Sequence, residues 1–311
     1  EFEVNTLTTL LAEAEADPPE VALWECRQKP FEHPKHYNPV TGDTLWSSSA
    51  CAMFRTEALQ RVNGYEPRLF MYGEDVELSY RLRDYGYRLR YVAKATVWHY
   101  TYEAAAQVKP MQFLGSTYAN VMLRCRYGSK KQVISGFAMY LGLLTLPQGF
   151  EGQRIGLLKN LFKIVRHAPA FLRSRRTSCE PFPFRMWDYE MVREGSFYQY
   201  PPVVPDAPKP LVSVLTRTTP GKTGRLREAI ASVKAQTYTR VHLVVVEDGG
   251  STASDMMREL KDSGELEDVT YLPLSKMGRC GAGNAALAAA RGELLCFLDD
   301  DDLFYADHLE V

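Results

Sequence analysis

The last hundred residues alternate short apolar runs with helix-spaced apolar residues, and this alternation limits the possible folds more than any other feature. Val- and Leu-rich runs predict strands, and apolar residues three or four positions apart predict helices. The predicted strands are 211–216, 242–246, 269–272 and 294–298, and the predicted helices are one around 226–233, then 252–262 and 283–290. This βαβαβαβ order is typical of a mostly parallel sheet covered on both faces.

Polar residues follow three of the predicted strands, where parallel sheets of this kind bind their ligands. Thr216 and Thr218 lie at the end of the first strand, Glu247 and Asp248 follow the second, and Asp299–Asp302 follow the last. Because these carboxyl ends meet at one edge of the sheet, the sequence predicts a polar binding site there.

The run of four aspartates, Asp299–Asp302, comes directly after the apolar run Leu294–Leu298. Two carboxylates about 4 Å apart repel by about 1 kcal/mol in water, and by roughly 4 kcal/mol at an effective dielectric of 20. A divalent cation would offset this repulsion, since hard cations prefer carboxylate oxygens. The sequence therefore predicts a metal site, and without a cation the cluster would repel a diphosphate. The alternative is a solvated acidic turn.

The composition excludes some classes of protein. The 311 residues suffice for one large domain or two to three ordinary ones, and a formal net charge of −1 argues against a nucleic-acid partner. The six cysteines are scattered, which predicts buried free thiols in a reducing compartment and a cytoplasmic location. The chain begins at Glu1 rather than at a methionine, so we interpret it as a piece of a longer protein.

Three regions of the chain differ in composition and in predicted secondary structure. Residues 1–104 mix strands with one helix, residues 105–208 hold a helical segment and a Pro-rich linker over 177–209, and residues 209–311 carry the alternating pattern. The stretch 154–176 is amphipathic and basic. It could lie on an anionic membrane surface, at the inner face of the membrane, or pack on the core with a solvated basic face.

The last region resembles the nucleotide-binding half of a family 2 glycosyltransferase of the A-type fold. The resemblance is carried by "LVSVLTRTTPG" (211–221), by "VVVEDGGS" (244–251) and by "GRCGAGNAALAAARGELLCFLDDDD" (278–302). Arg217 stands where that family usually has a proline.

The resemblance implies roles for these residues. Either Glu247 or Asp248 would accept from the nucleotide base, most often uracil, and Asp299 would lie near the ribose. Asp301 would hold Mn²⁺ or Mg²⁺ against the diphosphate, with Asp302 as a second candidate ligand. The remaining nucleotide-binding candidates are Thr216, Thr218 and Asn284.

Residues 44–100 resemble the other half of the same fold, which in that family follows the aspartate motif. There a Glu-Asp pair supplies the catalytic base, and the matching residues are Glu74 and Asp75. An acid in the first turn of a helix also complements the helix dipole, which is the alternative reading of Asp75. His99 would complete the metal shell, or would pack at a strand end.

The two halves thus occur in reversed order. The chain most resembles the middle of a tandem enzyme cut through both transferase domains, and a permuted domain within one chain or between two chains is the alternative. The implied architecture is two α/β halves with a helical connecting segment. The implied activity is inverting, metal-dependent transfer from a nucleoside-diphosphate sugar to a glycan or lipid-linked acceptor in surface polysaccharide synthesis. A nucleotide- or glycan-binding module without activity is the alternative from another class.

Overall fold

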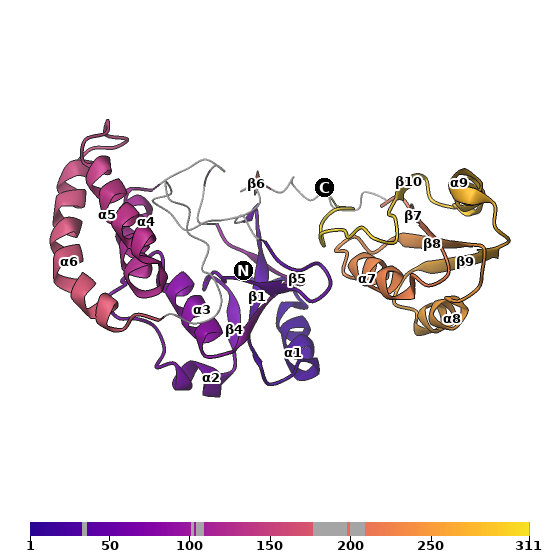
Figure 1. Ribbon diagram of the computed structural model, residues 1–311, viewed down its shortest axis with the longest axis horizontal. Coiled ribbons are helices and arrows are strands. Elements are labelled where there is room, and N and C mark those ends of the chain that lie inside the picture. The colour runs from indigo at the N-terminus through magenta and orange to yellow at the C-terminus, as the bar shows by residue number, and fades with distance from the viewer. Residues whose placement is uncertain (33–35, 101–102, 104–108, 177–197, 200–208, 311) are drawn as a thin grey trace. The chain divides into compact units, whose positions relative to one another are not determined.

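The computed structural model describes all residues except 33–35, 101–102, 104–108, 177–197, 200–208 and 311 (Figure 1). Nearly all of the predicted linker over 177–209 therefore lies outside the described residues, as does Cys179. The chain divides into two compact units. Unit 1 consists of Glu1–Tyr37 and Asp43–Pro201, and unit 2 consists of Asn38–Gly42 and Pro202–Val311.

Unit 1 is built on a four-stranded sheet in the order β3-β5-β1-β4. The central strands, β1 and β5, are parallel, and the outer strands, β4 and β3, pair with them in antiparallel fashion. The elements of this part are α1 (Thr6–Ala16), β1 (Val21–Lys29), β2 (Phe31–Glu32), β3 (Asp43–Thr44), β4 (Ala52–Phe54), α2 (Thr56–Arg61), α3 (Glu74–Asp84) and β5 (Arg88–Trp98).

Strand β1 is buried along its whole length because helices pack on both faces of the sheet. Trp24 and Cys26 share a core with Leu10 of α1, whereas Leu23 shares a core with Leu78 of α3. These contacts follow the alternation of side chains along a strand.

Three longer helices complete unit 1: α4 (Pro110–Tyr127), α5 (Lys130–Leu143) and α6 (Gln153–Arg173) (Figure 1). They share a core of their own, and α5 begins with a capping box between Ser129 and Gln132. The short strand β6 (Tyr198–Gln199) pairs with β2. The predicted helical segment is thus present, and it belongs to the same unit as the half that precedes it.

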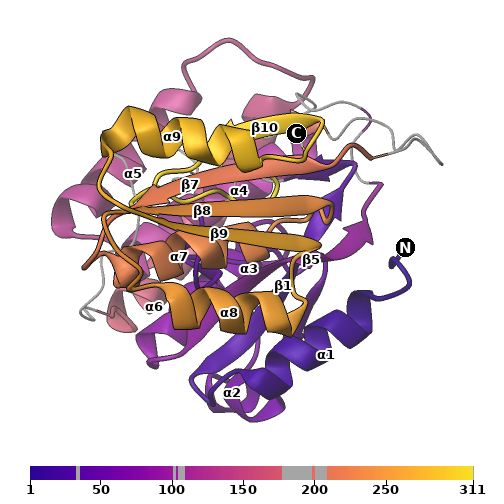
Figure 2. The same cartoon turned by 90° about the vertical axis from the view of Figure 1, so that its right-hand side faces the viewer.

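Unit 2 contains a four-stranded sheet in the order β10-β7-β8-β9, and all neighbouring strands in it are parallel (Figure 2). Its elements are β7 (Val212–Thr218), α7 (Thr223–Lys234), β8 (Val241–Asp248), α8 (Ser254–Ser263), β9 (Asp268–Leu274), α9 (Gly278–Ala289) and β10 (Leu294–Phe297). The predicted βαβαβαβ order is confirmed.

Helices cover both faces of this sheet. Val214 and Leu243 pack with residues of α7 and α8, whereas Leu215 and Val244 pack with Ala282 and Ala286 of α9. Helix α9 begins five residues before the predicted start at 283, so its Gly-rich first turn is helical as well.

The cysteines agree only in part with the prediction of buried free thiols. All those in the described residues are free, and Cys26, Cys51 and Cys125 are buried. Cys296 is partly exposed and Cys280 is exposed, because Cys280 lies in the first turn of α9 and not in an apolar run.

Candidate functional site

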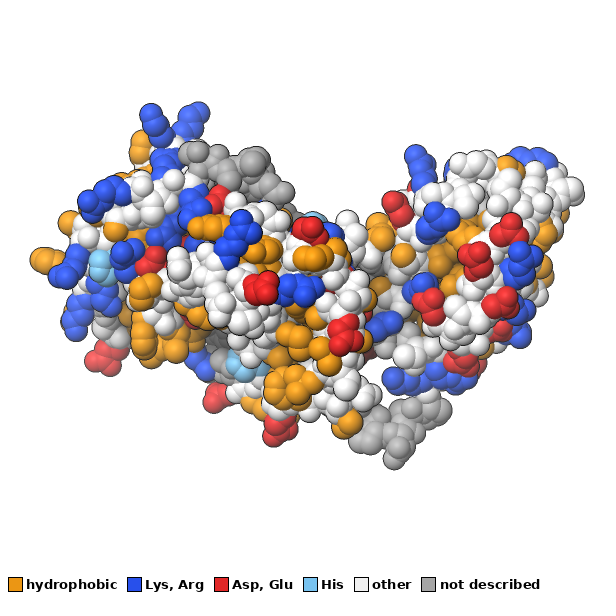
Figure 3. All heavy atoms as spheres, turned by 90° about the horizontal axis from the view of Figure 1, so that it is seen from below, with side chains coloured by type: hydrophobic (Ala, Val, Ile, Leu, Met, Phe, Trp, Pro, Cys, Tyr) orange, Lys and Arg blue, Asp and Glu red, His pale blue; other side chains and the backbone are white. Residues whose placement is uncertain are grey.

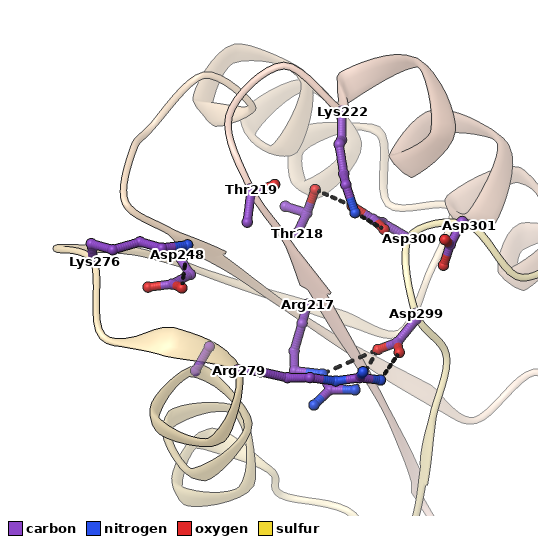
Figure 4. A pocket seen from close by; sticks show the side chains of 11 residues that line it. Arg217, Thr218, Thr219, Lys222, Asp248, Lys276, Arg279, Asp299, Asp300 and Asp301 are labelled. Atoms are coloured by element: carbon purple, nitrogen blue, oxygen red, sulfur yellow. Dashed lines mark hydrogen bonds and ion pairs between the residues drawn. The ribbon is translucent and has the colours of Figure 1, made fainter.

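A pocket of about 320 Å³ lies in unit 2 beside the carboxyl ends of β7, β8 and β10 (Figure 4). This is the edge of the sheet at which the sequence predicts a polar site. Basic and acidic side chains share its wall. The lining residues are Arg217, Thr218, Thr219, Lys222, Asp248, Lys276, Arg279, Ala282, Asp299, Asp300 and Asp301.

Asp299 is held between two arginines, Arg217 from β7 and Arg279 from α9 (Figure 4). The Nη2 atom of Arg217 lies 2.6 Å from Oδ1 of Asp299, and Nη2 of Arg279 lies 2.9 Å from Oδ2. The guanidinium of Arg217 also lies over the ring of Phe297, at 5.4 Å from its centroid. Two cations thus neutralise the carboxylate that the family resemblance places near the ribose.

Asp300 is buried, and it forms part of the pocket wall through contacts with its neighbours. Its Oδ2 accepts from the Thr218 hydroxyl at 2.8 Å, and its Oδ1 lies 3.0 Å from Nζ of Lys222. The predicted nucleotide residue Thr218 therefore lines the pocket while its hydroxyl donates to Asp300.

Asp301 and Asp302 are more open to solvent than Asp299 and Asp300. The side chain of Asp301 is 53% exposed, lines the pocket and lies 3.8 Å from Arg225. Asp302 is exposed, and its backbone N–H donates to the carbonyl of Asp299 in a turn. The repulsion that the sequence predicts within the run is thus offset by arginines and a lysine of the protein itself.

Asp248, at the end of β8, lines the pocket and organises the start of α9. Its carboxylate accepts from the backbone N–H groups of Met277 and Gly278, and it lies 2.8 Å from Nζ of Lys276. The hydrogen bond from Lys276 is the main reason why the pKa of Asp248 lies below its usual range.

Glu247 is fully buried and does not line the pocket. Its two oxygens accept from the backbone and hydroxyl of Thr252, from the N–H of Ala253 and from the hydroxyl of Tyr271. Burial raises the pKa of Glu247, but these hydrogen bonds together lower it by more, so the pKa lies below its ordinary value. Both carboxylate oxygens of Glu247 therefore already accept hydrogen bonds from the protein, whereas Asp248, the alternative acceptor for the base, lines the pocket.

Two other predicted nucleotide residues also lie outside the pocket wall. Thr216 is buried within β7, and Asn284 is exposed on α9. The prediction missed Lys222, Lys276 and Arg279. All three are basic residues that lie between the end of a parallel strand and the first turn of the next helix, and this position could have identified them.

The predicted acid pair, Glu74 and Asp75, opens helix α3 in unit 1. The preceding residues, Tyr72 and Gly73, both have positive φ angles, of 67° and 103°. Glu74 is half-buried, and its Oε2 atom has no hydrogen-bond partner among the described residues. Burial, together with the charge of Asp75, raises the pKa of Glu74 to about 7. A carboxyl group with a pKa near neutrality is typical of acid–base sites.

His99 directly follows β5 and is half-buried. Its Nδ1 lies 3.0 Å from Oε1 of Gln28, and burial lowers its pKa. A neutral imidazole is the form that binds metal ions. His99, Glu74 and Asp75 belong to unit 1, whereas the pocket belongs to unit 2.

A divalent cation fits this pocket only if a bound ligand supplies some of the oxygen atoms that coordinate it. The described residues contain no group of three or more His, Cys, Asp or Glu side chains placed to hold a metal. Mg²⁺ needs only one or two carboxylates when phosphate oxygens supply other ligands. Asp301 meets that requirement, because its carboxylate is at the pocket wall and is half open to solvent.

Two segments of the chain match known families. Residues 222–311 match the family described as Glycosyl transferase family 2, and residues 23–112 match the one described as Glycosyltransferase like family 2. The first match spans most of unit 2, and the second contains Glu74, Asp75 and His99.

Individual relatives match shorter stretches. An uncharacterised glycosyltransferase of Nostoc sp. is 36% identical over 86 residues, which cover 27% of this chain and 26% of that protein. The O-antigen biosynthesis protein RfbC of Myxococcus xanthus is 34% identical over 96 residues, covering 30% of this chain and 8% of that protein. The chain thus spans about a quarter or less of these relatives.

Among solved structures, the mannosyltransferase PcManGT from Pyrobaculum calidifontis, in complex with GDP-Man and Mn²⁺, is 27% identical. The match covers 33% of this chain and 31% of that one, with a TM-score of 0.29. Within the described part of this chain, no helix is both long and apolar enough to cross a membrane.

Proposed function

We propose that this chain carries the donor pocket and the general base of a family 2 glycosyltransferase, which transfers a sugar from a nucleoside-diphosphate sugar, a UDP-sugar in the first instance, to a glycan or lipid-linked acceptor. The process served is surface polysaccharide synthesis. The matched relative from Myxococcus xanthus, an O-antigen biosynthesis protein, supports this assignment.

The observation that carries the proposal is the mixed charge of the pocket in unit 2. Four basic side chains line it together with four aspartates. The cations suit the diphosphate of a donor, and Asp248 offers acceptor oxygens for the nucleoside. A purely acidic turn would offer no site for the diphosphate.

Asp301 would hold Mn²⁺ or Mg²⁺, with Asp302 as a further candidate ligand. His99 of unit 1 is a candidate metal ligand in the half that carries Asp75. When bound, the ion would stabilise negative charge on the departing diphosphate. Lys222, Lys276 and Arg279 neutralise charge at the same pocket, so part of the donor affinity comes from the protein itself.

Asp75 is the proposed general base. It takes the proton of an acceptor hydroxyl as that oxygen bonds to the anomeric carbon and the bond from this carbon to the diphosphate breaks. This single displacement inverts the anomeric configuration. Glu74, with a pKa of about 7, carries a proton in part of the molecules at neutral pH, which limits its repulsion of Asp75.

Titration calorimetry of the chain with UDP and GDP, in Mn²⁺, in Mg²⁺ and in EDTA, tests the donor site. We expect UDP to bind more tightly with a metal and to lose affinity in Arg279→Ala. Equal affinity with metal and with EDTA would exclude the metal assignment. Absence of binding by either nucleotide under all three conditions would exclude the donor site.

A binding module without turnover is the second candidate, and the double arginine clamp on Asp299 favours it. A donor ribose must compete with both guanidiniums for that carboxylate. Release of free sugar from a sugar nucleotide, dependent on metal, would distinguish an enzyme from such a module.

A further inference from the structure

Helix α6 carries two apolar stripes, although a helix on a globular core needs only one. The inner stripe is buried and includes Leu157, Ile164 and Phe171. The outer stripe is exposed and follows the same helical spacing. Its members, with their exposed fractions, are Ile155 (61%), Leu158 (54%), Phe162 (86%), Val165 (66%) and Leu172 (40%).

The charge on α6 has a single sign. The helix contains five Lys and Arg residues and no Asp or Glu, and all five are exposed. They are Arg154, Lys159, Lys163, Arg166 and Arg173. At 100° per residue, all but Arg154 lie along one side of the outer stripe. Figure 3 shows Lys and Arg side chains gathered with hydrophobic ones over the end of unit 1 that carries α6.

The combination of apolar stripe and cationic flank fits an anionic lipid surface. Lysines and arginines would contact the headgroups while the apolar side chains enter the boundary with the acyl chains. A second copy of the chain fits poorly, because the same five cations would face each other across the contact. An uncharged apolar partner would leave the cations without a role.

We propose that the outer stripe of α6, with its flanking lysines and arginines, docks unit 1 on an anionic lipid surface. The helix lies parallel to that surface, since no helix in the described residues meets the requirements of a span. The proposal is independent of the donor pocket, which lies in unit 2.

Flotation of the whole 311-residue chain with vesicles tests the proposal. Vesicles of phosphatidylcholine mixed with phosphatidylglycerol, an anionic lipid, are compared with vesicles of pure phosphatidylcholine. We expect binding to the anionic vesicles only, and loss of binding as salt shortens the Debye length. Phe162→Asp with Val165→Asp should weaken binding at least about tenfold. Lys159→Glu with Lys163→Glu should weaken it about fivefold or more per residue.

Two matched variants serve as controls. Leu7→Asp with Leu11→Asp places the same charges at exposed apolar positions of α1, and Arg258→Glu with Lys261→Glu reverses exposed charges on α8. Both should float like the unchanged chain. All variants alter exposed positions, so melting temperatures and UDP binding should stay unchanged, which separates this test from that of the proposed function.

Three results would overturn the proposal. The first is failure of the unchanged chain to float with anionic vesicles, and the second is equal flotation of the α6 and α1 variants. The third is a dimer in solution that Phe162→Asp converts to monomer, which would assign the stripe to a protein contact instead.

Discussion

Asp299, Asp300 and Asp301 are consecutive in the chain, yet each has a different environment. Asp299 lies between two arginines, Asp300 is buried against Thr218 and Lys222, and Asp301 is half exposed. The burial and the charge around a carboxylate determine whether it can bind a ligand. Only Asp301 combines a place in the pocket wall with access to solvent.

Replacing Asp301 by alanine should therefore affect binding and not folding. We expect the metal-dependent part of UDP affinity to fall at least about tenfold, as when a metal site loses a supporting group. The free energy of unfolding without metal should change by no more than about 0.5 kcal/mol, because the side chain is largely exposed. Calorimetry and urea unfolding measure the two quantities.

The neighbouring variant Asp300→Ala is the matched comparison. It removes a buried carboxylate and leaves Thr218 and Lys222 without their acceptor, so we expect a loss of stability of about 1–3 kcal/mol. If Asp301→Ala destabilised the metal-free protein as much as Asp300→Ala does, Asp301 would be a structural residue.

Glu74 should destabilise the protein at alkaline pH. Its pKa of about 7 in the folded protein lies above the ordinary value of 4.5, so the folded state binds more protons between these limits. The stability that Glu74 contributes is fully present below pH 4.5 and is lost as pH rises through 7. Glu74→Gln should therefore stabilise the protein at pH 8, on the order of 1 kcal/mol after a discount for partial exposure, and much less at pH 4.5.

Urea unfolding at the two pH values measures this difference. Glu57→Gln is the control, because Glu57 is an exposed acid in the first turn of α2. If Glu74→Gln increased the free energy of unfolding equally at both pH values, the pKa of Glu74 would not be raised in the folded state.

Helix α3 has a glycine with positive φ at each end, Gly73 before its first residue and Gly86 beyond its last. Their surroundings differ. A Cβ at Gly73 would lie 2.5 Å from Cβ of Ala119 on α4, whereas a Cβ at Gly86 would meet nothing within 4 Å. Gly73 thus lets α4 approach the turn that presents Glu74.

Alanine substitutions at the two glycines should separate the backbone cost from the packing cost. Gly86→Ala should destabilise by about 1 kcal/mol, the cost of a left-handed conformation. Gly73→Ala should cost about 1–3 kcal/mol more, because α4 must also move. Urea unfolding measures both, and equal losses would contradict the role of close packing against Ala119.

The elements of unit 2 were predictable because each strand is a dense apolar run. The early start of α9 was not, since "GRCGAGN" has poor helix propensity and Ala282 and Ala286 pack on the sheet only in the fold. The arginine clamp was equally hidden. Arg217 meets Asp299 across 82 residues, and no local pattern indicates such a pairing.

The same limit applies to Glu74 and Glu247. Motif resemblance identified the acids themselves. The raised pKa of Glu74 arises mainly from burial, and the acceptors of Glu247 are saturated by hydrogen bonds that form only in the fold. Residue type and spacing indicate which groups can do chemistry, and packing determines which of them remain available.

The proposed base and the donor pocket belong to different units of the chain. Strand β10, at one edge of the sheet in unit 2, exposes Leu294, Leu295 and Phe297. Such an edge can pair with a further strand. The matched stretches cover 26% and 8% of the two relatives described above, so most of each relative lies outside its match.

Transfer requires the base and the departing diphosphate on opposite sides of one sugar carbon, and a misplacement of about 1 Å can cost two orders of magnitude in rate. We therefore expect the 311-residue chain to bind UDP and yet to transfer little or no sugar. Assays with a panel of sugar nucleotides and glycan acceptors, in Mn²⁺ and in EDTA, measure this. Vigorous turnover that disappears in Asp75→Asn and in Asp301→Ala would contradict the expectation. Since each variant removes a group from a different unit, that result would mean that the two units form one active site.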